Sequence, residues 1–63
     1  MPSAVAVKVL IVDDQNSVRQ MTRMTLEELG FRHIHEAENG GQAMETASLQ
    51  PLDLIISDYN MPE

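Results

Sequence analysis

The feature that most constrains the fold is the segment VLIVDD at residues 9–14, in which four apolar residues precede two adjacent carboxylates. Three of the four apolar residues are β-branched, and a short continuous apolar run is typical of a parallel strand buried on both faces. We therefore predict a central strand over residues 7–12. Because ligands of open α/β sheets bind at the carboxyl ends of the strands, Asp13 and Asp14 are candidate functional residues.

Two further segments predict strands. Residues 52–57, LDLIIS, repeat the plan of the first strand and are also followed by a carboxylate, Asp58. Residues 33–37, HIHEA, contain a single β-branched residue and predict a shorter edge strand. His33 and His35 share one face of that strand, but we favour solvated or packing histidines over a metal site because no third ligand type lies nearby.

The segment between the first two strands predicts an amphipathic helix. Asn16 or Ser17 is the expected N-cap, and the helix should run to about Leu29 with Gly30 at its C-terminal turn. At about 100° per residue, the expected buried stripe consists of Val18, Met21, Thr25 and Leu29, flanked by Leu26. Opposite this stripe lie Arg19, Arg23 and Glu27, while Met24 is expected to be exposed.

A second helix is expected over residues 42–49, after a turn at Gly40 and Gly41. Its inward-facing residues are predicted to be Ala43, Met44 and Ala47. Neither of the two common glycine-rich nucleotide motifs occurs, so the glycine pair does not indicate a phosphate-binding loop.

The order β-α-β-α-β predicts parallel strands joined by right-handed crossovers. With the first strand central, the fold is an α/β, flavodoxin-like half domain whose strand order is 2-1-3, with its helices on opposite faces. Asp13, Asp14 and Asp58 then meet at one sheet edge, roughly 5 Å apart in backbone terms. Such acids can simply begin turns, but three of them together favour a divalent cation, and all-oxygen ligands suit Mg²⁺ better than zinc.

Composition narrows the classes of partner. The 63 residues make at most one small domain, with 43% apolar and 22% charged residues and a net charge of −6. Without a cluster of lysine or arginine we expect no nucleic-acid partner, and without an apolar run of about 18 residues we expect no membrane span. The absence of cysteine and of a secretory signal pattern predicts a cytoplasmic protein.

Four segments, VLIVDD, LGF, EAENG and LIISDYNMP, together cover the parts of the chain discussed above. They resemble the first half of a response-regulator receiver domain, and the resemblance extends over nearly all of the chain, so residues 1–63 are expected to form one half-receiver domain. It implies that Asp58 accepts a phosphoryl group from the phosphohistidine of a histidine kinase. It also implies a Mg²⁺ site in which Asp14 and Asp58 are direct ligands, Asp13 acts mainly through water, and Asn60 contributes its backbone carbonyl.

The resemblance also has a gap. Receiver domains continue with two more β-α units that supply a Ser/Thr and a Lys to hold the phosphoryl oxygens, whereas this sequence stops at Glu63. Lys8, its only lysine, is expected about 16 Å from the acids and cannot substitute. We therefore expect a truncated receiver with impaired phosphotransfer.

Two other classes remain open. One is a non-catalytic half-domain that self-associates, because the outer edge of the strand at residues 52–57 would be bare and would favour a homodimer. The other is a phosphohydrolase that forms an aspartyl phosphate. Those enzymes commonly carry D-x-D on one strand, whereas here the pair is adjacent and Asp58 lies 44 residues after Asp14.

Overall fold

The computed structural model describes residues 4–57. After a short 3₁₀ turn, η1, the strands and helices alternate along the chain. Their bounds are η1 Ala4–Ala6, β1 Lys8–Val12, α1 Asn16–Glu28, β2 His33–Ala37, α2 Gly40–Leu49 and β3 Leu54–Ser57. No helix within residues 4–57 is long and apolar enough to cross a membrane.

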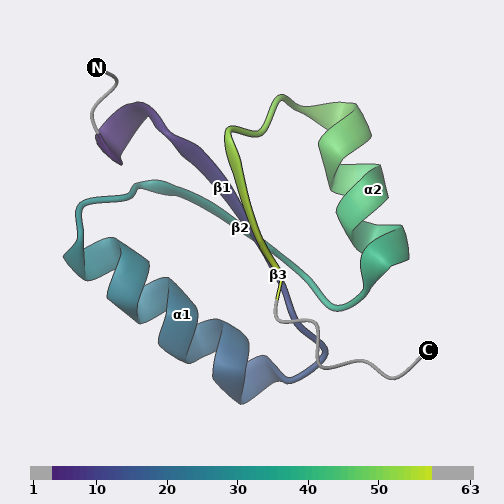
Figure 1. Ribbon diagram of the computed structural model, residues 1–63, viewed down its shortest axis with the longest axis horizontal. Helices are drawn as coiled ribbons and strands as arrows, with labels where there is room; N and C mark the ends of the chain where they lie inside the picture. Colours follow the sequence, from purple (N-terminus) through teal and green to yellow (C-terminus); the bar gives the residue numbers. More distant parts are fainter. Residues whose placement is uncertain (1–3, 58–63) are drawn as a thin grey trace.

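The strands form one parallel sheet in the order β2-β1-β3, as predicted. The helices lie on opposite sides of this sheet (Figure 1), which gives the flavodoxin-like half-domain architecture expected from the sequence. In the sheet register Val12 is level with Ala37 of β2 and with Ser57 of β3. All three strands therefore end at the same edge, and that edge is where the acid pair begins.

β1 is the centre of the core because it contributes to both faces of the sheet. Val9 and Ile11 point to the α1 face, where they pack with Leu26, Ile34 and the half-buried Val7, Phe31 and Ile56. Leu10 and Val12 point to the α2 face and pack with Ala37, Ala43 and Leu52. Val9 and Leu10 are fully buried, as expected of a continuous apolar run in a central strand.

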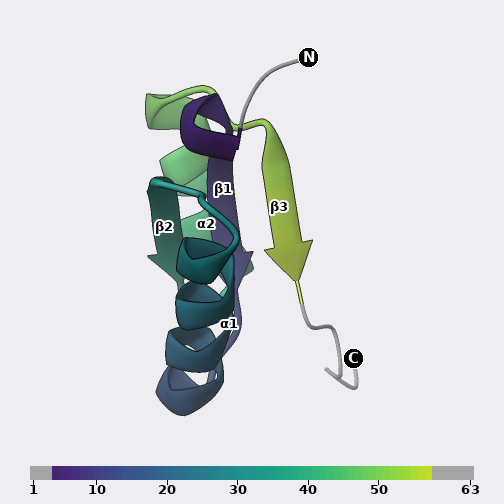
Figure 2. The ribbon, with the colours of Figure 1, turned by 90° about the vertical axis from the view of Figure 1, so that its left-hand side faces the viewer.

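β3 is covered less completely than the other strands. In Figure 2 it stands to one side of both helices, and within the described residues it pairs with β1 alone. Leu54 and Ile55 remain 42% and 53% exposed. One edge and much of the surface of β3 are therefore open.

The strands β1 and β3 each begin later than predicted, at Lys8 rather than Val7 and at Leu54 rather than Leu52. The reason for the later start of β3 is a side-chain interaction. The backbone N–H of Lys8 donates to Oδ2 of Asp53 at 2.9 Å, and the N–H of Asp53 donates to the Lys8 carbonyl at 2.8 Å. A carboxylate thus takes the place of one ladder acceptor at the start of the pair.

The predicted cap and buried stripe of α1 are wrong in part. The helix begins at Asn16, and Gln15 occupies the N-cap position without a side-chain hydrogen bond. Met21, Thr25 and Leu29 are exposed, whereas Leu26 is buried and Val18 half-buried. Arg19, expected on the solvent side, is buried, and Arg23 is half-buried. The helix is rotated because Glu36 on β2 binds both guanidinium groups.

The start and the inner face of α2 also differ from the prediction. Both glycines of the expected turn are helical, because the Asn39 side chain caps the helix and accepts from the N–H of Gln42 at 2.9 Å. Ala43 packs against the core and Thr46 is half-buried, while Met44 is 76% exposed and Ala47 is also exposed. Of the three residues predicted to face inward, only Ala43 packs on the core, so hydrophobicity alone did not determine which face is buried.

Candidate functional site

Asp13 is held at the carboxyl end of β1 by its own backbone and side chain. It is 7% exposed, and its N–H donates to the carbonyl of Ala37 at 3.0 Å, which continues the pairing with β2. Its Oδ1 accepts from the N–H of Gln15 at 2.9 Å. Asp14, the next residue, is exposed, and its carboxylate accepts no hydrogen bond within the described residues. The pair therefore combines one fixed and one open carboxylate.

A buried guanidinium lies beneath the acid pair. Arg19 donates from Nη1 to the backbone carbonyl of Asp13 at 2.7 Å and from Nη2 to Oδ1 of Asn16 at 3.0 Å. Its Nε donates to Oε1 of Glu36 at 3.0 Å. One side chain thereby joins the end of β1, the first residue of α1 and the strand β2.

Glu36 accepts from a second arginine as well. Nε of Arg23 donates to Oε2 of Glu36 at 2.6 Å, and Nη2 of Arg23 donates to the carbonyl of Ile34 at 2.9 Å. The Arg23 hydrogen bond is the main cause that lowers the pKa of Glu36 below its ordinary value; the Arg19 bond lowers it further, and burial opposes both. Glu36 is therefore ionised at neutral pH, which compensates the buried charge of Arg19.

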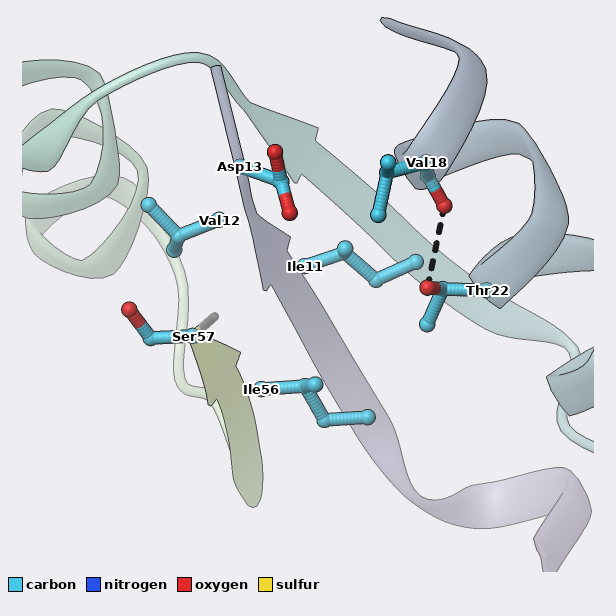
Figure 3. A pocket seen from close by; sticks show the side chains of 7 residues that line it. All are labelled: Ile11, Val12, Asp13, Val18, Thr22, Ile56 and Ser57. Atoms are coloured by element: carbon cyan, nitrogen blue, oxygen red, sulfur yellow. Dashed lines mark hydrogen bonds between the residues drawn. The ribbon is translucent and has the colours of Figure 1, made fainter. Parts of the chain in front are cut away.

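A hollow of about 340 Å³ opens beside the acid pair on the α1 side of the sheet. Figure 3 shows the side chains that line it, among them Asp13 after β1 and Val18 and Thr22 of α1. The hollow is also lined from β1 and β3, by Ile11, Val12, Ile56 and Ser57. The Thr22 hydroxyl donates back to the carbonyl of Val18 at 3.0 Å, so the helix wall of the hollow is mostly apolar.

The remaining predicted site residues, Asp58 and Asn60, lie outside the described residues. What the structure establishes is the register of β3: its last residue, Ser57, is level with Val12, the residue before Asp13. Within residues 4–57, no three side chains of the His, Cys, Asp or Glu types lie close enough together to hold a metal ion.

The structure also places the two histidines and the lysine named in the sequence analysis. His33 is exposed and His35 half-buried on the edge strand β2, and no metal cluster forms around them in the described part of the chain. Lys8 begins β1, at the opposite end of the strand from Asp13. The sequence analysis missed Arg19 and Glu36. The sequence did contain a signal for this contact: two arginines four residues apart on the predicted helix, and a single acid within the predicted edge strand.

A comparison with family models identifies the family to which the chain belongs. The model described as the response regulator receiver domain matches residues 9–63, which include the acid pair and all of the sheet except Lys8, the first residue of β1. The chain belongs to the response regulator receiver domain family. Receiver domains generally use Mg²⁺ at their phosphorylation site, and histidine kinases are their general kind of partner.

Curated receiver proteins of chemotaxis are similar to this chain. A probable chemotaxis protein CheY of Rhizobium etli is 46% identical over 63 residues, which are 100% of this chain and 49% of the relative. The chemotaxis protein CheY-3 of Vibrio cholerae is 36% identical over 55 residues, 87% of this chain and 42% of the relative. The chain thus spans about half the length of these curated relatives. No solved structure gives a significant match.

The donor set of the receiver fits a magnesium ion. Asp13 and Asp14 offer hard carboxylate oxygens at one sheet edge, which Mg²⁺ prefers to nitrogen or sulfur. The N–H of Gln15 donates to Oδ1 of Asp13, which leaves Oδ2, and Asp14 is exposed. Few protein ligands with room for water is the arrangement in which Mg²⁺ is usually bound.

Proposed function

We propose that the protein is a phosphoryl acceptor of two-component signalling and that Asp58 is its acceptor residue. The observation that carries this proposal is the register of the sheet, in which Val12 and Ser57 are level. The acid pair follows Val12 and Asp58 follows Ser57 in the sequence. Parallel strands that end together bring the residues after them to a common edge.

The proposed donor is the phosphohistidine of a histidine kinase. A carboxylate oxygen of Asp58 attacks phosphorus, the new O–P bond forms as the N–P bond breaks, and the bond electrons return to the histidine ring, which takes up a proton. Three acids at one edge repel one another, and a bound cation would offset that repulsion. Asp13, Asp14, Asp58 and the Asn60 carbonyl would hold Mg²⁺, which supplies charge neutralisation for the transferring phosphoryl group.

These 63 residues alone should react slowly, as expected of a half-receiver. Their single lysine, Lys8, lies at the far end of β1 and cannot meet charge on the phosphoryl oxygens. Weak Mg²⁺ binding, with a Kd of about 1 mM or poorer, is expected for a ligand shell formed only by the residues above.

Intact-mass measurement after treatment with acetyl phosphate and Mg²⁺ tests the acceptor. A small fraction of protein should gain one phosphoryl group, and Asp58→Asn should abolish the gain while Asp53→Asn, at the other end of the sheet, should not. Modification that persists in Asp58→Asn would refute the assignment. NMR titration with Mg²⁺ tests the metal site, where Asp14→Asn should remove the shifts at residues 13–15.

We also propose that the protein self-associates through β3. Its outer edge has unpaired backbone groups within the described residues, and Leu54 and Ile55 are 42% and 53% exposed. A second copy related by a two-fold axis would pair β3 with β3 antiparallel, which merges two three-stranded sheets and enlarges two small cores.

Light scattering coupled to size exclusion, over a dilution series, tests this association. Ile55→Lys should shift the protein toward monomer. Met24→Lys is the control, because it introduces a lysine at a similarly exposed apolar residue on α1, where Met24 is 60% exposed. A folded wild-type monomer at all concentrations, with stability independent of concentration, would contradict the dimer.

A further inference from the structure

We propose that Arg19 is a positioning residue for the acid pair. It orients the peptide group that joins Asp13 to Asp14, and it thereby sets the affinity of the pair for a divalent cation. This inference rests on the proposed magnesium site. It is carried by the hydrogen bond from Nη1 of Arg19 to the Asp13 carbonyl, 2.7 Å long and buried.

The carbonyl oxygen of Asp13 belongs to the peptide group that joins Asp13 to Asp14. Because that group is planar, a bond to its oxygen orients the whole plane, including the N–H and Cα of Asp14. The N–H and Oδ1 of Asp13 are already held by Ala37 and Gln15. Arg19 therefore completes the set of bonds that fixes where the open carboxylate of Asp14 begins.

The side chain of Arg19 is itself fixed. Its three nitrogens donate to three acceptors on different segments, Asp13, Asn16 and Glu36, and its side chain is 9% exposed. A planar fork of donors can span such acceptors, whereas the compact ammonium of lysine cannot reach all three at once. The ionised Glu36 offsets the free-energy cost of burying the Arg19 guanidinium.

Arg23 provides the matched comparison. It binds the same Glu36, at 2.6 Å, and the carbonyl of Ile34, at 2.9 Å, so it also fastens α1 to β2. It makes no hydrogen bond to Asp13. A purely structural role for the arginines would make the two positions equivalent for metal binding, whereas a positioning role would distinguish them.

Titration of Mn²⁺ followed by electron paramagnetic resonance measures cation affinity directly, with circular dichroism on the same samples to verify folding. Arg19→Lys keeps the charge, so Coulomb repulsion of the cation is preserved and only the hydrogen-bond geometry changes. We expect its Mn²⁺ affinity to fall about tenfold, the usual scale for loss of an outer ligand support. Arg23→Lys should stay within about twofold of wild type.

Two further variants guard against misfolding and against a simple charge effect. Asn16→Ala leaves the net charge unchanged and alters an exposed residue. It should weaken Mn²⁺ binding several-fold because Nη2 of Arg19 loses its acceptor. Arg19→Gln removes a cation near the acids, which by charge alone would strengthen binding; we expect weaker binding. Unchanged affinity in Arg19→Lys and Asn16→Ala, or tighter binding in Arg19→Gln, would overturn the proposal. If Asp14→Asn binds Mn²⁺ with the affinity of the wild-type protein, the proposed metal site itself is refuted.

Discussion

Nε of Arg23 lies 2.6 Å from Oε2 of Glu36, in an ion pair that fastens the middle of α1 to the edge strand β2. The other carboxylate oxygen of Glu36, Oε1, pairs with Nε of Arg19 at 3.0 Å, and the Glu36 side chain is 20% exposed. The network thus adds polar contacts between a helix and a strand that contribute Leu26 and Ile34 to the same apolar cluster.

The first prediction concerns Glu36 and acid stability. The pKa of Glu36 is lowered in the fold from an ordinary value of 4.5, chiefly by its hydrogen bond to Arg23. The resulting stability is complete above pH 4.5 and is lost as pH falls through the folded-state pKa. Glu36→Gln should lower the free energy of unfolding at pH 7 by about 1.5 kcal/mol or more. Urea unfolding at pH 7 and at pH 3 checks this, since the variant should differ least from wild type at pH 3.

The second prediction concerns the cap of α2. The Asn39 side chain accepts from the N–H of Gln42 at 2.9 Å, so Asn39→Ala should destabilise the protein by ~1 kcal/mol. Ser17, a cap candidate on sequence grounds, makes no capping bond at the start of α1. Ser17→Ala should therefore leave the urea midpoint nearly unchanged, and equal effects of the two substitutions would contradict the assignment.

The third prediction concerns which face of α1 is buried. Leu26 is 7% exposed and belongs to the core, whereas Met21 is 68% exposed. Leu26→Ala should cost roughly 2–4 kcal/mol, and Met21→Ala should cost less than about 0.5 kcal/mol. Thermal unfolding followed by circular dichroism separates these outcomes; a larger loss for Met21→Ala would mean that the helix is rotated from the position described.

The fourth prediction concerns two glycines with opposite demands. Gly30 follows α1 with φ of 101°, a conformation that strains any residue with a Cβ. A Cβ at Gly40 would meet no atom within 4 Å, and that residue is helical. Gly30→Ala should therefore destabilise the fold by about 1 kcal/mol, and Gly40→Ala should stabilise it by roughly 0.5 kcal/mol. Chemical denaturation of both variants measures the difference in sign.

The sequence by itself determined the order of the elements, the central place of β1 and the sheet edge at which Asp13 and Asp14 lie. The VLIV run requires burial on both faces, and the alternation of strands and helices allows few parallel topologies. The strand His33–Ala37 was predicted to the residue.

Only the tertiary structure decided which sides of the helices are buried and where the helices begin. Arg19 is buried because Glu36, distant in sequence, supplies the compensating charge, and a period of hydrophobic residues along one helix contains no information about a partner on another strand. The cap at Asn39 and the Lys8–Asp53 bonds likewise depend on backbone geometry at element ends. Hydrophobic patterning predicts which elements must meet, whereas polar contacts between them set their rotation and their ends.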